Sequence, residues 1–108
     1  MNINKTDIEG LAIITPKVFD DDRGYFFESW NKEVFESEGI KNEFLQDNQS
    51  LSMKGVLRGL HFQNPPYEQG KLVRVIKGSV LDVAVDIRKN SPTYGEHIMV
   101  HLNEDNKR

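Results

Sequence analysis

Short apolar runs separated by turn residues constrain the fold of this chain more than any other feature. The runs are rich in β-branched and aromatic residues, and they lie at 11–15, 25–30, 44–46, 56–62, 72–76, 80–87 and 98–102. Residues typical of turns stand between them, as in Asp22-Arg23-Gly24 and Asn64-Pro65-Pro66. Many short strands with turn signals are typical of an all-β sandwich or barrel, so the sequence predicts a mainly β fold.

Two strand patterns are more specific. Lys77-Gly78 stands between residues 73–76 and 79–81, and it predicts a tight hairpin turn there. In 80–87 the side chains alternate between two faces of a strand. One face carries Leu81, Val83, Val85 and Ile87, and the other carries Val80, Asp82, Ala84 and Asp86. The second face then borders either solvent or a polar cavity.

One short helix is expected near residues 32–38. Asn31 can cap its first turn, Val34 and Phe35 give it a small apolar face, and Gly39 suits a left-handed end. A helix of this length depends on tertiary packing, because short helices are marginal in water.

Length and charge narrow the classes of function. A chain of 108 residues suits one domain, and a net charge of -3 with a pI near 5.6 argues against a broad nucleic-acid or anionic-membrane surface. The absence of cysteine excludes disulfides and thiolate metal sites. No apolar run reaches the length of a membrane span, and the polar start is no signal peptide, so a cytoplasmic protein is expected.

A histidine and two cations lie close together in the sequence, at Arg58, His61 and Lys71. Burying such groups is costly unless a partner or an anionic ligand compensates them, so the stretch indicates a lined pocket. An edge strand with solvated polar tips, and a structural histidine, are the alternatives. His61 could act as a general base and Lys71 could stabilise an anion. For Arg58 and His61 to serve one site, Gly59 must mark a bulge or twist.

A metal site is the competing interpretation of the same histidine. Gly55 and His61 fit the first motif of the cupin superfamily, but Gln63 stands where metal-binding cupins have a second histidine. His97 and His101 would share a strand face, yet no carboxylate stands beside them. A metal needs three or four ligands in defined geometry, so no metal is expected.

Polar residues upstream could bind a nucleotide. Arg23 lies at a turn, where its planar fork could bind a phosphate with two hydrogen bonds. Gln46, Asp47 and Asn48 could recognise amide and hydroxyl groups of a base or a sugar. For each group an ordinary solvated turn is the alternative.

Taken together, these stretches resemble the dTDP-4-dehydrorhamnose 3,5-epimerase family of the rhamnose pathway. The resemblance runs nearly end to end, and it rests on several long motifs that occur in order. They are Pro16-Lys17-Val18-Phe19, Asp22-Arg23-Gly24-Tyr25-Phe26-Phe27-Glu28-Ser29, Gln46-Asp47-Asn48, Val56-Leu57-Arg58-Gly59-Leu60-His61-Phe62-Gln63, Gln69-Gly70-Lys71-Leu72-Val73-Arg74, Asp82-Val83-Ala84-Val85-Asp86-Ile87-Arg88 and Ser91-Pro92-Thr93.

The resemblance implies a cupin-type jelly roll without a metal or other cofactor. Residues 1–50 would supply the N-terminal strands and the helix, and residues 51–108 the first part of the jelly roll. It also implies a homodimer or higher homo-oligomer that exchanges N-terminal strands, and a dTDP-sugar substrate inverted at C3 and C5.

The resemblance further implies a role for each polar residue. His61 would be the base that removes the hydrogens next to the ketone, and Lys71 would stabilise the enolate oxygen. Arg58 would contact the pyrophosphate. The residues that would bind the nucleotide, partly across the dimer interface, are Arg23, Glu28, Gln46, Asp47 and Asn48.

The chain departs from the family pattern at its end. The family's chains continue past this point to a proton-donating tyrosine and to the acid that orients the base, so these 108 residues are expected to be a truncated, inactive N-terminal part. The alternative is a non-catalytic jelly-roll module that at most binds a thymidine nucleotide-sugar.

Overall fold

The computed structural model describes all 108 residues. They form two compact units, one made of residues 1–40 together with 73–108 and the other of residues 41–72. All the strands and the helix lie in the first unit, whereas the second consists of irregular backbone with turns. The expected division at residues 50 and 51 stays a prediction.

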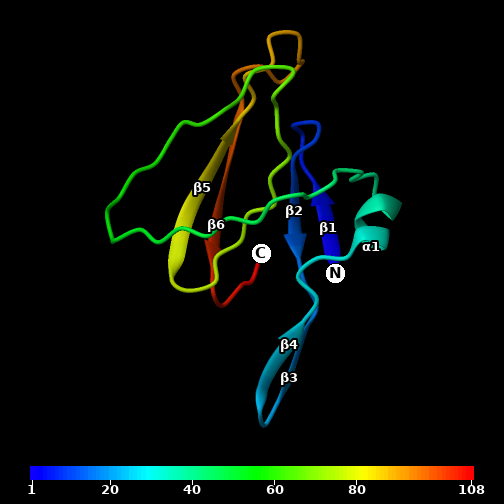
Figure 1. The fold of residues 1–108 in the computed structure, drawn as a ribbon, viewed down its shortest axis with the longest axis vertical. Helices are drawn as coiled ribbons and strands as arrows, with labels where there is room; N and C mark the ends of the chain where they lie inside the picture. Colours follow the sequence, from blue (N-terminus) through cyan, green and yellow to red (C-terminus); the bar gives the residue numbers. More distant parts are fainter. The chain divides into compact units, whose positions relative to one another are not determined.

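Three antiparallel hairpins make up the strands of the first unit (Figure 1). They pair β1 (Asn2–Lys5) with β2 (Ala12–Thr15), β3 (Val18–Asp21) with β4 (Gly24–Phe27), and β5 (Ser79–Val85) with β6 (His97–Asn103). Each sheet has two strands, so no ladder joins one hairpin to another. The predicted mainly β fold with one short helix is confirmed.

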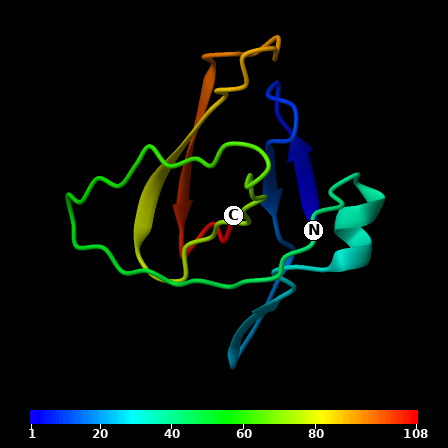
Figure 2. The ribbon, with the colours of Figure 1, turned by 45° about the horizontal axis from the view of Figure 1, so that its top comes forward.

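Helix α1 (Lys32–Ser37) forms where it was predicted, and both of its ends are capped. At its start, the Asn31 side chain accepts a hydrogen bond from the Val34 backbone N–H at 3.2 Å. At its end, the N–H of Gly39 donates to Glu36 and that of Ile40 donates to Phe35, while Gly39 takes a φ of 85°. Phe35 is the buried residue of the helix, at 2% exposed, and Figure 2 shows α1 beside β1.

The predicted hairpin at Lys77-Gly78 is wrong. Residues 73–76 form no strand, and β5 pairs instead with β6, which is more distant in the sequence. Gly78 lies opposite the end of β6, where its carbonyl accepts from the Glu104 N–H at 3.1 Å and its N–H donates to the Glu104 carboxylate at 3.0 Å. A turn dipeptide marks a change of direction, but it does not determine which strand becomes the partner.

The predicted strands at 44–46, 56–62 and 72–76 are also absent. Apolar composition shows that a segment suits a sheet, but a strand needs a neighbour to complete its hydrogen bonds. Gly59, at a φ of 130°, further breaks the extended backbone of 56–62. Conversely, β1 and β3 form although no apolar run predicted them, because each lies beside a strand that follows it closely.

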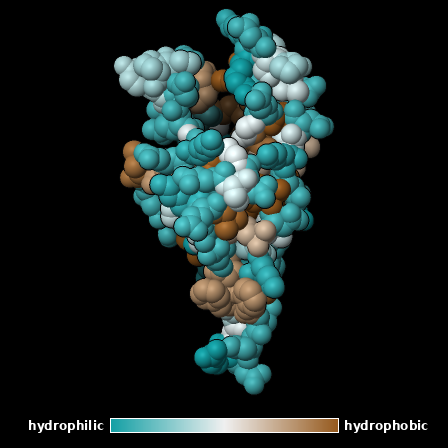
Figure 3. All heavy atoms as spheres, turned by 90° about the vertical axis from the view of Figure 1, so that its right-hand side faces the viewer, coloured by the Kyte–Doolittle hydropathy of each residue, from teal (hydrophilic) through white to brown (hydrophobic).

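Apolar side chains in this chain are largely exposed. Ile8, Phe35 and Leu102 are the buried apolar residues. Figure 3 shows apolar side chains gathered on the hairpin β3–β4, above its polar tip. Phe19 and Phe26 lie on this hairpin, and Phe26 is 71% exposed.

Candidate functional site

The eight predicted site residues divide between the two units. Arg23 and Glu28 lie in the first unit. The second unit holds His61, Lys71, Arg58, Gln46, Asp47 and Asn48. Each unit therefore holds its own set of candidate residues.

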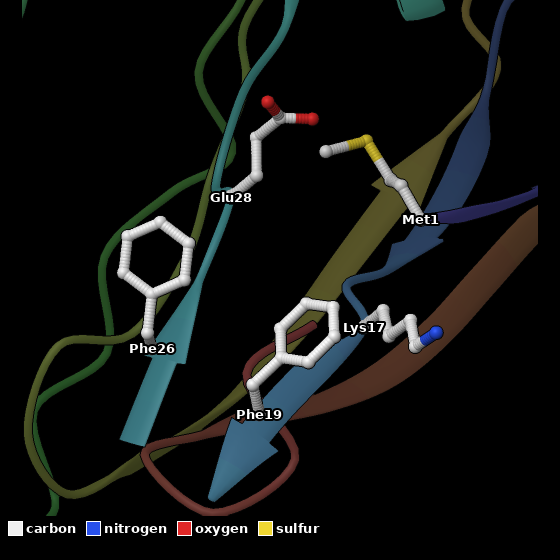
Figure 4. A pocket seen from close by; sticks show the side chains of 5 residues that line it. All are labelled: Met1, Lys17, Phe19, Phe26 and Glu28. Atoms are coloured by element: carbon white, nitrogen blue, oxygen red, sulfur yellow. The ribbon is translucent and has the colours of Figure 1, made fainter. Parts of the chain in front are cut away.

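A hollow on one face of the hairpin β3–β4 is the candidate site of the first unit. It has a volume of about 290 Å³, and its walls come from Met1, Lys17, Phe19, Phe26 and Glu28 (Figure 4). Phe19 and Phe26 are paired across the ladder, and side chains directly opposite each other share a face. Lys17 and Glu28 stand two residues from them along the chain, and the period of two brings them to the same face.

The side chains around this hollow combine aromatic faces with both signs of charge. Lys17 Nζ lies 5.0 Å from the centre of the Phe19 ring. The Glu28 carboxylate accepts a hydrogen bond from Asn31 Nδ2 at 3.0 Å, which connects the end of β4 to the start of α1. A hollow of this kind suits a flat ring with polar edges, because ring faces can stack on phenyl groups while a carboxylate accepts from an N–H.

The sequence prediction missed Phe19, Phe26, Lys17 and Met1 as lining residues. A signal for three of them was present, because Lys17 and Phe19 alternate along one strand as Phe26 and Glu28 do along the next. The contribution of Met1 carried no such signal.

Arg23 stands in the tight turn that joins β3 to β4. Its guanidinium forms an ion pair with Asp21, with Nη2 2.5 Å and Nε 3.1 Å from Oδ2, and its backbone N–H donates to Oδ1 at 2.8 Å. The hydrogen bonds from Arg23 lower the pKa of Asp21, and those from Asp21 raise the pKa of Arg23. The Arg23 side chain remains highly exposed, so the pair could open toward an anion.

The opposite face of β4 contacts cations from the later part of the chain. Lys107 Nζ lies 4.1 Å from the centre of the Tyr25 ring, and Arg74 Cζ lies 5.8 Å from that of Phe27. Such cation–π contacts are attractive because the ring face carries negative charge density. These contacts lie on the face of β4 that carries Tyr25 and Phe27, whereas the Phe19–Phe26 face of the hairpin stays open.

In the second unit some of the predicted residues form side-chain hydrogen bonds. Gln46 Nε2 donates to Asn48 Oδ1 at 3.1 Å. Arg58 donates from Nε to Ser52 Oγ at 2.9 Å and from Nη2 to the Leu51 carbonyl at 3.0 Å. The partner Ser52 was not among the predicted residues.

The side chains of His61 and Lys71 are exposed, and within this chain they form no hydrogen bond or ion pair. The sequence predicted that His61 and Lys71 line a pocket, but in this unit neither side chain is buried. Both groups face solvent in the 108 residues.

A buried carboxylate that was not among the predicted site residues lies after β5. Asp86 is 4% exposed, and its partners are the side chains of Arg88, Ser91 and Thr93. These hydrogen bonds, with Arg88 contributing most, hold the pKa of Asp86 far below its usual range. Its face was expected to border solvent or a polar cavity, but the chain's own turn covers this residue.

No three side chains among the histidines, aspartates and glutamates come together as a metal site. No helix in the structure has the length and apolar character needed to cross a membrane. His97 and His101 lie on one face of β6, where they pair with Val85 and Leu81 rather than with carboxylates.

Nearly the whole chain matches one family of known proteins. A family model described as dTDP-4-dehydrorhamnose 3,5-epimerase matches residues 5–108. The chain belongs to the dTDP-4-dehydrorhamnose 3,5-epimerase family. A curated member from Shigella flexneri, "dTDP-4-dehydrorhamnose 3,5-epimerase", is 60% identical over 109 residues, which are all of this chain and 60% of that protein.

Solved structures of this epimerase family match the chain closely. The Bacillus anthracis epimerase with TDP and PPi bound has a TM-score of 0.93 at 42% identity, covering 98% of this chain and 61% of that one. The Legionella pneumophila epimerase in complex with dTDP-4-keto-L-rhamnose has a TM-score of 0.91 at 52% identity, covering 98% and 56%. The expected fold, a part of the cupin-type jelly roll of these epimerases, is confirmed. The chain spans about 60% of the length of the Shigella relative.

Proposed function

We propose that the whole protein acts as a dTDP-4-dehydrorhamnose 3,5-epimerase, which inverts C3 and C5 of dTDP-4-keto-6-deoxyglucose, whereas these 108 residues alone are inactive. The observation that carries the proposal is the 52% identity to the Legionella epimerase, whose structure is a complex with dTDP-4-keto-L-rhamnose. That sugar is the expected product of inverting both carbons.

The chemistry of a 4-keto sugar explains why a histidine and a lysine suffice to start the reaction. Hydrogens on C3 and C5 are acidic because the C4 ketone can accept the electrons of the broken C–H bond. His61 would take the proton, and the Lys71 ammonium would stabilise the negative charge that develops on the ketone oxygen. A proton delivered by solvent to the opposite face inverts the carbon, and His61 gives the first proton back to solvent. No electron leaves the substrate, so the step requires no redox cofactor.

The hollow on β3–β4 suits the base of the nucleotide. The Phe19 and Phe26 rings offer stacking faces, and the Glu28 carboxylate can accept from the imide N–H of thymine. In the same proposal Arg23 and Arg58 bind the phosphates, and Gln46, Asp47 and Asn48 bind further polar groups of the nucleotide.

We also propose a homodimer or higher homo-oligomer, located in the cytoplasm. The exposed apolar surface of the hairpin β3–β4 supports an assembly in which a second subunit covers the part of this surface outside the nucleotide hollow, since monomers rarely expose large apolar patches.

A second candidate function is a non-catalytic nucleotide-binding module. It is favoured by the exposure of His61 and Lys71, which have no hydrogen-bonding partner within these residues. Catalysis usually demands a base oriented by a second group.

Two measurements separate the candidates. Incubation of the whole protein with dTDP-4-keto-6-deoxyglucose in deuterated water, followed by NMR, should show deuterium at C3 and C5 if the protein is an epimerase. Calorimetry with dTDP should show binding in either case. Binding without deuterium incorporation would overturn the epimerase proposal, and absence of both would overturn the two candidates together.

A further inference from the structure

Arg58 is held by two acceptors that precede it in the chain. Its Nε lies 2.9 Å from Ser52 Oγ, and its Nη2 lies 3.0 Å from the carbonyl oxygen of Leu51. A turn at residues 53–56, closed by a bond from the Val56 N–H to the Met53 carbonyl at 3.3 Å, brings residue 58 back beside residue 52. The contact is therefore local to the second unit.

The two bonds use one particular edge of the guanidinium. Nε–H and the nearer Nη2–H point in the same direction and form the side edge of the fork. Ser52 and Leu51 occupy that edge. The end edge, formed by one N–H from each terminal nitrogen, has no partner in the chain and has the spacing that matches two oxygens of a phosphate.

We propose that Ser52 is a positioning residue, whose hydroxyl orients Arg58 so that the end edge of its guanidinium faces the diphosphate of the nucleotide. The inference rests on the proposed function, because that function makes Arg58 the diphosphate ligand. Ser52 itself does not touch the ligand. It acts by reducing the rotamer freedom that a long arginine side chain loses when it binds an anion.

The test compares dTDP with thymidine as ligands of the intact protein. Ser52→Ala should weaken dTDP binding by about three- to tenfold, the usual effect of one hydrogen bond, and leave thymidine binding unchanged. Ser52→Thr keeps a hydroxyl and should restore most of the dTDP affinity. Ser50→Ala, which removes a nearby hydroxyl with no bond to Arg58, is the matched control and should bind both ligands normally.

A double variant separates this proposal from the function on which it rests. In the Arg58→Ala background, Ser52→Ala should cause no further loss of dTDP affinity, because the group that it orients is absent. If Arg58→Ala alone leaves dTDP affinity intact, the proposed diphosphate role fails. If Arg58→Ala weakens binding but Ser52→Ala does not, or if Ser52→Ala weakens thymidine binding equally, only the positioning role is overturned.

Discussion

The Arg88 guanidinium donates two hydrogen bonds to the Asp86 carboxylate, with Nε 2.9 Å from Oδ1 and Nη2 3.0 Å from Oδ2. The hydroxyls of Ser91 and Thr93 donate to the same carboxylate, at 2.5 and 2.7 Å from Oδ2. The Asp86 backbone also bonds to Gly95 and Glu96. The side chain and backbone of Asp86 thus form hydrogen bonds with five residues of the connection between β5 and β6.

This arrangement predicts a loss of stability in acid. Because folding lowers the pKa of Asp86, its ionised form adds stability at pH values above its unfolded pKa of about 3.9. That contribution is lost as the pH falls toward the folded pKa. We expect Asp86→Asn to have a lower unfolding temperature at neutral pH and to lose less on acidification than the wild type. Asp82→Asn, on the same strand face without such partners, is the control, and identical pH profiles for the wild type and Asp86→Asn would contradict the prediction.

Asn31 has two separable roles, one in the helix and one at Glu28. Its side-chain oxygen caps α1 and its amide donates to the Glu28 carboxylate. Asn31→Ala should lower the free energy of unfolding by about 1 kcal/mol, the usual loss of an N-cap. Asn31→Asp keeps a capping oxygen but puts a second carboxylate beside Glu28.

We therefore expect Asn31→Asp to retain most of the free energy of unfolding, measured with denaturant. Its affinity for the anionic dTDP, measured by calorimetry, should fall because of the second carboxylate. Equal stability losses in the two variants would show that the cap is not what Asn31 contributes.

Replacement of His61 tests the proposed base. His61→Ala in the active protein should slow incorporation of deuterium at C3 and C5 by about two to four orders of magnitude, because a positioned base contributes on that scale. Binding of dTDP, measured by calorimetry, should persist. Near-normal exchange in the variant would remove His61 from the role.

Metal removal should have no effect. Gln63 offers an amide where a metal site would need a stronger ligand, and no cluster of three histidine or carboxylate side chains forms. Prolonged chelation should leave the unfolding temperature and any epimerase activity unchanged. Stoichiometric zinc, iron or manganese that is lost together with activity would show that a metal belongs to the site.

Assembly can be measured by sedimentation at low micromolar concentration. Open strand edges and the exposed aromatic face of β3–β4 favour association, so we expect a dimer at least, with residues 11–15 and 25–30 crossing between subunits. A monomer that unfolds cooperatively at this concentration would contradict the prediction.

Local signals in the sequence predicted the elements that depend on local chemistry. Asn31 and Gly39 bracket α1 because a cap and a left-handed end are properties of one or two residues. The alternation of side chains in residues 80–87 predicted most of β5, because this pattern too is local to the strand. The pairing of strands was harder to predict from the sequence. Lys77-Gly78 predicted a hairpin turn, but the partner of β5 is the more distant β6.

The candidate site was predictable in its residue types but not in its contacts. The motifs pointed to Arg58 and Glu28, whereas the bonds of these residues to Ser52 and Asn31 depend on how turns return the chain on itself. The hollow beside Phe19 and Phe26 depends on ladder register, which no single motif contains.

The pairing of strands in twos has a consequence for amide hydrogen exchange. Each of the six strands has a ladder partner on one side only, and in an antiparallel ladder alternate N–H groups point away from that partner. Exchange rates along each strand should therefore alternate between slow and fast with a period of two. A strand added at any open side would slow the fast set there, so the exchange pattern would report, amide by amide, which sides are covered.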